Sequence, residues 1–190
     1  MIRKLSFFSV IVGLLLPAGE LQAGSASTTL SFSAFFYGGS CEINVPAQLP
    51  YNNGNPIPDN SISDDKRFRQ FEVTLANCQG YFMKPRITVT GNTITTSDGV
   101  KLFADATSTT KGYGVRIAAT GNKYFNDNTN AAISNVISAK DWSVDSSNNA
   151  ASLNGSLVFR AYLSCGACTA GDNLQNGELT ATVTFSFLYD

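Results

Sequence analysis

Hydrophobic and polar residues alternate most regularly in the C-terminal stretch, residues 177–190. The odd positions after Gly177 carry the apolar set: Leu179, Ala181, Val183, Phe185, Phe187 and Tyr189. The even positions are polar or charged, apart from Leu188. A period of two puts alternate side chains on one face of a strand, and Thr, Val and Phe favour strands. The pattern predicts a half-buried terminal strand whose long apolar edge needs cover from another segment.

A second alternating stretch lies near the N-terminus. Leu30, Phe32, Ala34 and Phe36 share one parity, and Gly38-Gly39 follows them. One interpretation is an ordinary first strand of the domain. The other is a detachable arm, residues 24–40, with a glycine hinge behind it.

Between these stretches the sequence predicts many short strands. They are expected within residues 41–45, 71–77, 87–89, 100–103, 114–118 and 157–163. Residues 47–66 are expected to be a proline-containing loop, and residues 131–139 are compatible with a short helix. Asn154-Gly155 is a typical hairpin turn. Short strands at roughly ten-residue spacing, separated by turn residues, predict an all-β sandwich.

Composition limits the classes of function. Of 190 residues, 43% are hydrophobic and only 14% are charged. This is enough apolar material for one hydrophobic core, and the chain is short for two domains. The net charge of −1 gives no electrostatic attraction to nucleic acid or to an anionic membrane surface. Histidine is absent, which excludes histidine-based catalytic triads, metal sites and pH switches. No cofactor is expected, and no carboxylate pair points to an enzyme.

The first 23 residues have the pattern of a secretory signal. Arg3 and Lys4 precede an apolar run, residues 5–16, that Pro17 ends, and Ala23 offers a small residue for cleavage. The run is too short to span a membrane. We therefore expect export into an oxidising compartment, where cysteines pair.

The four cysteines allow three connectivities. Cys165 and Cys168 are close enough to pair with each other most simply. A CxxC can be a redox motif at a helix N-terminus, but this one follows a strand and leads into a polar loop. A structural staple is therefore favoured over catalysis. A bridge between Cys41 and Cys78 would close a long loop and stabilise the fold by about 3.5–4 kcal/mol.

Taken in order, these features resemble chaperone–usher fimbrial subunits, the pilins of Gram-negative bacteria. The features begin with the signal, the alternating arm and Cys41. They continue with FEVTLANC at residues 71–78, GVRIA at residues 114–118 and LVFRAYL at residues 157–163. The last is a terminal strand with Gly177 and the penultimate residue Tyr189. The resemblance covers the whole chain after the signal. The CxxC departs from the family pattern.

The resemblance implies an incomplete immunoglobulin-like sandwich, residues 41–190, that lacks its final strand. A periplasmic chaperone and then the arm of the next subunit would fill the resulting groove, with assembly at an outer-membrane usher into an extracellular fimbria. Cys41–Cys78 would be the family disulfide. Leu30, Phe32, Ala34 and Phe36 would form the donor strand. The face from Gly177 to Tyr189 would line the groove.

A second hypothesis is a minor or tip subunit that binds a host glycan. Trp142 could then stack on sugars together with Tyr113, Tyr124 or Phe125, although packing within the protein is the favoured role of Trp142. Asn126, Asn128 and Asn130 have the spacing of a calcium loop, but Ala131 and Ile137 stand where that loop needs Gly and Glu.

Overall fold

The computed structural model describes residues 31–34, 38–62, 67–169 and 173–190. The chain divides into two compact units, Met1–Phe35 and Phe36–Asp190. In the first unit, residues 31–34 have no regular secondary structure, and the side chain of Phe32 is 88% exposed. The expected signal, Leu30 and Phe36 lie outside the described residues.

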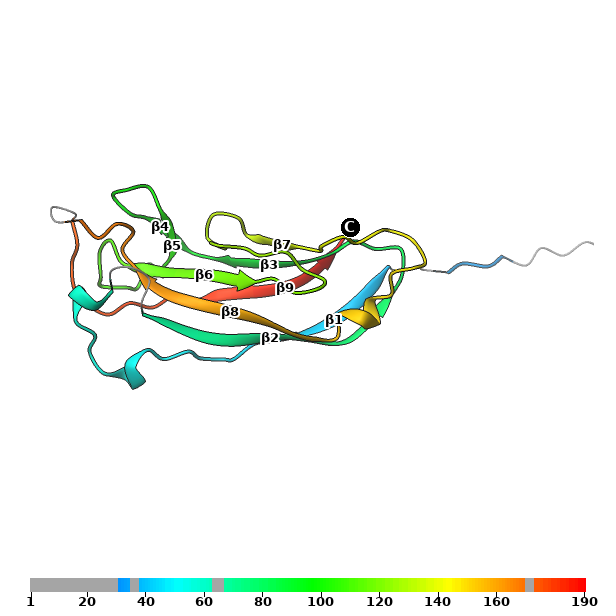
Figure 1. The fold of residues 1–190 in the computed structure, drawn as a ribbon, viewed down its shortest axis with the longest axis horizontal. Coiled ribbons are helices and arrows are strands. Elements are labelled where there is room, and N and C mark those ends of the chain that lie inside the picture. Colours follow the sequence, from blue (N-terminus) through cyan, green and yellow to red (C-terminus); the bar gives the residue numbers. More distant parts are fainter. Residues whose placement is uncertain (1–30, 35–37, 63–66, 170–172) are drawn as a thin grey trace, which may run out of the picture. The chain divides into compact units, whose positions relative to one another are not determined.

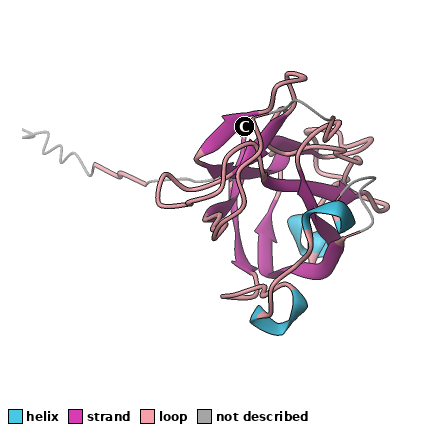
Figure 2. Ribbon diagram, turned by 90° about the vertical axis from the view of Figure 1, so that its left-hand side faces the viewer, coloured by secondary structure: helices cyan, strands magenta, loops and turns pink. Residues whose placement is uncertain are grey.

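The second unit is all-β and contains two antiparallel sheets (Figures 1 and 2). In spatial order, the six-stranded sheet contains β1 (Gly39–Asn44), β2 (Phe68–Gly80), β8 (Gly155–Ser164), β6 (Gly114–Thr120), β5 (Lys101–Phe103) and β4 (Thr93–Thr95). The other sheet contains β7 (Val136–Ser138), β3 (Pro85–Gly91) and β9 (Val183–Tyr189). Short 3₁₀ turns form η1 (Asn52–Gly54), η2 (Asp59–Ser61) and η4 (Ala150–Leu153). Across the described ranges, no helix is long and apolar enough to cross a membrane.

Inward-facing residues of both sheets form one hydrophobic core. Val73 and Leu75 of β2, Ile87 and Val89 of β3, and Phe159 of β8 are fully buried. Each set recurs at every second position, which is the alternation that a half-buried strand requires. The all-β prediction is therefore confirmed, and each strand expected between residues 41 and 163 is present.

Strand boundaries differ from the prediction at both ends of the second unit. Gly38 and Gly39 were predicted to form a hinge before the domain, but Gly39 is the first residue of β1 and is buried. A Cβ on Gly39 would lie 2.5 Å from the main-chain oxygen of Gln79 and from Sδ of Met83. Gly39 is therefore needed for close packing of β1 on β2. At the other end, β9 begins at Val183 rather than near Gly177.

The short helix considered for residues 131–139 is wrong. This stretch is a turn followed by β7. The buried side chain of Asn128 donates to the main-chain oxygens of Ser134 and Val136, and Asn130 accepts from the N–H of Ala132. Asparagine side chains here replace the main-chain bonds that a helix would have made.

Two disulfides are present, Cys41–Cys78 and Cys165–Cys168. The first joins residues 37 positions apart on β1 and β2, whereas the second spans three positions. Cys78 belongs to the hydrophobic core, and Cys41 packs against it.

Replacing Cys41 and Cys78 by Ser should lower the free energy of unfolding by about 3–4 kcal/mol, because the denatured chain loses a long closed loop. Replacing Cys165 and Cys168 by Ser is the matched control and should cost clearly less. Urea denaturation of both variants measures the difference. Equal losses would contradict the assignment of Cys41–Cys78 as the main covalent brace of the fold.

Candidate functional site: a groove beside an open strand edge

The strand β9 lies at an edge of the three-stranded sheet. Its only strand partner in the described part of the chain is β3. Asp190 and Lys84 exchange both main-chain hydrogen bonds at the end of this ladder. Because antiparallel pairs alternate, the even-numbered residues of β9 direct their N–H and C=O groups toward β3. The odd-numbered residues direct theirs toward the open edge.

The same alternation continues into the segment before β9. The even-numbered residues are held by the loop of residues 105–109. Asp105 donates its N–H to the oxygen of Thr180, Thr109 donates to Glu178, and the carboxylate of Asp105 accepts from the N–H of Thr182. Leu179 and Ala181 make no main-chain hydrogen bond with any other described residue. Residues 178–182 therefore extend the open edge of β9.

A groove with a volume of about 1220 Å³ runs along this open edge. One rim consists of residues 176–183 with Phe185, and the other is the loop of residues 45–59 with Ile62. The two rims come from opposite ends of the second unit's sequence. The groove is the space between the terminal strand and the loop that follows β1.

The floor of the groove is apolar. It is formed by Phe71 of β2, Val115 and Ile117 of β6, and Ala161 and Leu163 of β8. The ring of Phe71 stacks on Phe159 at 5.6 Å between centroids and meets Phe185 edge to face at 6.0 Å. The floor is thus continuous with the core, and a ligand seated there would cover apolar core side chains.

Polar contacts link the loop rim to the rest of the groove. The amide of Asn176 donates to the carboxylate of Asp59 at 3.4 Å, joining the two rims. The hydroxyl of Tyr51 donates to the main-chain oxygen of Ala161 at 2.7 Å, anchoring the loop on the floor. Burial raises the pKa of the Tyr51 hydroxyl, and the positive charge of Arg69 opposes this shift more weakly. Tyr51 is therefore a neutral donor at physiological pH.

The structure places most of the predicted groove face at this site. Gly177, Leu179, Ala181, Val183 and Phe185 line the groove, whereas Phe187 and Tyr189 are absent from its lining. Phe187 packs against the core, and Tyr189 lies beside Gly38 at the far end of β9. Gly177 has a packing role, because a Cβ there would lie 2.5 Å from the hydroxyl oxygen of Thr109.

Of the four residues predicted for the donor strand, Phe32 and Ala34 are described and both are exposed. The loop rim is what the sequence reasoning missed. Prolines and polar residues predicted a loop there, but nothing in that pattern showed that Leu49, Tyr51 and Ile57 pack against the core cluster. Apolar residues inside a proline-containing loop were the available signal.

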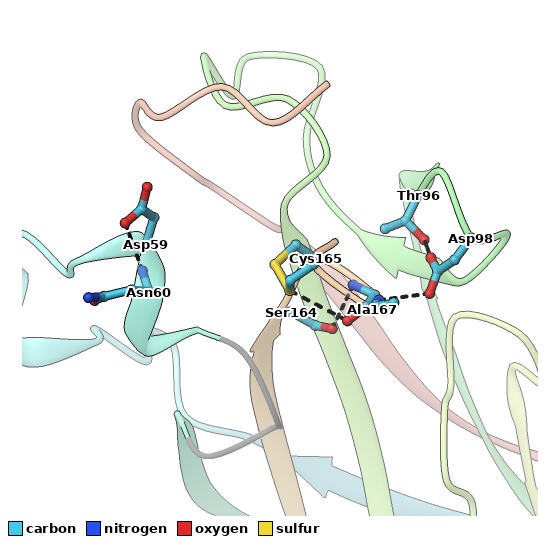
Figure 3. Close-up of a disulfide and its surroundings, with 9 residues drawn as sticks. Asp59, Asn60, Thr96, Asp98, Ser164, Cys165 and Ala167 are labelled. Carbon is cyan, nitrogen blue, oxygen red and sulfur yellow. Dashed lines mark hydrogen bonds between the residues drawn. A yellow bond between two sulfur atoms is a disulfide. The ribbon is translucent and has the colours of Figure 1, made fainter. Parts of the chain in front are cut away.

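The Cys165–Cys168 loop lies near one end of the groove, directly after β8. Figure 3 shows Ala167 of this loop and Asp98 of the β4–β5 turn directed toward each other. The N–H of Ala167 donates to the carboxylate of Asp98 at 2.7 Å, and the hydroxyl of Thr96 donates to its other oxygen. These two hydrogen bonds, that of Thr96 first, lower the pKa of Asp98 below its ordinary value.

The aromatic residues considered for sugar stacking do not form a shared flat surface. Tyr113 and Phe125 are buried. The rings of Trp142 and Tyr124 meet edge to face, at 74° between planes, and the indole N–H of Trp142 donates to the main-chain oxygen of Met83. Trp142 thus takes part in packing, as favoured from the sequence.

A scan of protein-family models and a search of curated proteins found no match to this chain.

Replacing Tyr51 by Phe should destabilise the protein by about 0.5–1.5 kcal/mol, since the oxygen of Ala161 loses one hydrogen-bond donor. Tyr81→Phe is the control, because the hydroxyl of Tyr81 meets Asn149 at an exposed position, and should cost less than about 0.5 kcal/mol. Chemical denaturation measures both variants. Equal stability of Tyr51→Phe and the wild type would show that this contact does not hold the loop rim.

Proposed function

We propose that this protein is a structural subunit of a chaperone–usher fimbria and polymerises by donor-strand exchange. The observation that carries the proposal is the apolar-floored groove beside the open edge of β9. In this proposal the second unit is an immunoglobulin-like sandwich that lacks one strand. An extended segment from another molecule supplies it by adding to the open edge.

The proposed occupant is the N-terminal arm of a second copy or of a related subunit. Its apolar residues, Leu30, Phe32, Ala34 and Phe36, recur with the period of a strand. The groove-lining rim contains Asn176–Val183 and Phe185, a span of roughly 30 Å for extended chain. The arm segment of residues 27–37 is long enough to cover this span. The two lengths are therefore compatible.

The chemistry of the arm also suits the groove. Residues 24–37 contain no charged side chain, only small, hydroxyl-bearing and apolar residues. An uncharged strand can be buried on the apolar floor without the desolvation cost of an ionised group. Each large apolar side chain that enters contributes about 1.5–3 kcal/mol. The main-chain groups of Leu179 and Ala181 would gain partners at the same time.

Strand donation between separate molecules generates a filament. The arm and the groove are different surfaces of the same chain, so the contact is head to tail and does not close on itself. The proposal includes three partners: a periplasmic chaperone that occupies the groove before assembly, an outer-membrane usher, and further subunits. The product would be an extracellular fimbria that supports adhesion.

A synthetic peptide of residues 27–37 should raise the melting temperature of the protein in a concentration-dependent manner, because it binds only the folded state. A peptide with Phe32→Asp is the matched control and should have little effect, since it would bury a carboxylate on the apolar floor. Differential scanning fluorimetry measures both. No shift with the wild-type peptide at saturating concentration would count directly against the groove as a strand acceptor.

Within the full chain, Phe32→Asp should leave the chaperone-bound subunit folded and should block fibre formation. Ala34→Phe should also block fibres, by overpacking the groove. Co-purification with the chaperone, compared with fibre assembly, separates the two roles of the arm. Loss of the folded chaperone complex in both variants would show that the arm is an internal strand of its own domain.

A further inference from the structure

The loop closed by Cys165–Cys168 adjoins β8 and contacts the β4–β5 turn. Cys165 directly follows β8, whose last residues, Leu163 and Ser164, line the groove. The loop it closes is tied through the N–H of Ala167 to Asp98 of the β4–β5 turn. The loop is therefore joined directly to the end of the groove floor.

A separate cavity of about 300 Å³ lies between Cys165 and the segment that precedes the terminal-strand rim of the groove. Cys165, Thr96, Lys111 and Leu174 are among the residues that line it. Lys111 and Gln175 exchange both main-chain hydrogen bonds, at 3.0 Å each. Gln175 immediately precedes Asn176, where the rim begins. Cys165 thus shares a cavity with Lys111, whose main chain is bonded to the residue that precedes the rim.

The conformation of the loop depends on its covalent closure. Gly166 and Cys168 both have positive φ, at 68° and 50°. A left-handed conformation is unfavourable for a residue with a Cβ, such as Cys168, and persists when its surroundings impose it. A Cβ on Gly166 would lie 2.2 Å from the carboxylate of Asp98, so the loop is held close to this side chain. Opening the ring releases Cys168 from this constraint.

We propose that Cys165–Cys168 is a redox modification site, opened by a dithiol reductant, whose state sets the affinity of the groove for its donor strand. The proposal rests on the function proposed above. Cys168 is the sulfur to attack, because it is half-buried whereas Cys165 is 2% exposed. Lys111 lines the same cavity as Cys165, and its positive charge would favour the departing thiolate.

The exchange is balanced by the dithiol alone. One thiolate of the reductant attacks Sγ of Cys168, forms a mixed disulfide and releases the thiolate of Cys165. The second thiol of the reductant then attacks the reductant sulfur that is bonded to Cys168. This closes a ring within the reductant and releases the thiol of Cys168. The reductant becomes an internal disulfide, and its two electrons and two protons pass to Cys165 and Cys168. Oxidation by a disulfide reverses both steps and restores the closed loop.

The first experiment determines which disulfide opens. The oxidised protein is treated with increasing concentrations of dithiothreitol, alkylated and mapped as peptides under non-reducing conditions. Cys165 and Cys168 should become alkylated at reductant concentrations that leave Cys41–Cys78 intact. Opening of Cys41–Cys78 first, or of both together, would overturn the proposal.

The second experiment measures the consequence for the groove. The affinity for the 27–37 peptide should fall about five- to tenfold on selective reduction, within the usual range of coupling between two sites. Replacing Cys165 and Cys168 together by Ser should give the same loss without reductant. Asp98→Ala keeps the disulfide but removes its contact with the β4–β5 turn, and should give a smaller loss in the same direction. Unchanged affinity in the reduced protein and in the double variant would overturn the coupling.

Hydrogen exchange separates failure of this inference from failure of the proposed function. Reduction should accelerate exchange at the N–H groups of Ala167 and Gln175 whether or not any peptide is present. The oxidised protein could bind no peptide while these two amides still exchange faster on reduction. That result would refute the strand-acceptor function and would support the coupling between the disulfide and the rim. If neither amide responds to reduction, the link itself is refuted.

Discussion

The central constraint on this structure is a stretch of the terminal-strand rim whose main-chain groups have no main-chain partner among the described residues. Leu179 and Ala181 line the groove there, whereas the even-numbered residues beside them are bonded to residues 105–109. An apolar edge of this kind is normally covered or interrupted. In the described part of the chain, β3 is the only strand that pairs with β9, and a groove lies along its other edge.

Several contacts fix the positions of the two rims. The hydroxyl of Tyr51 fixes the loop to the floor at Ala161, and Asn176 joins Asp59 across the end. Cys41–Cys78 fixes the strand from which that loop departs. These contacts explain how a groove of about 1220 Å³ can persist beside a hydrophobic core that would otherwise close over it. They also give the groove a defined shape.

Strand positions were readable from the sequence because burial on one face imposes a period of two, as in Val73 and Leu75 or Leu157 and Phe159. The order of strands was not readable, since no local pattern states that β8 lies between β2 and β6. The turn after Asn130 was misjudged because its hydrogen bonds come from buried asparagine side chains. The packing of the loop rim on the core was not predicted, because it depends on contacts between distant residues. Tyr51 and Ala161, for example, are 110 positions apart.

Hydrogen exchange at four neighbouring amides tests the central claim most directly. In the free protein, the N–H groups of Thr180 and Thr182 are bonded to Ser108 and Asp105 and should be protected. Those of Leu179 and Ala181 should exchange freely. Binding of the 27–37 segment should protect Leu179 and Ala181 strongly and change Thr180 and Thr182 little. Equal protection of all four amides in the free protein, or no gain at Leu179 and Ala181 with the segment bound, would contradict the account.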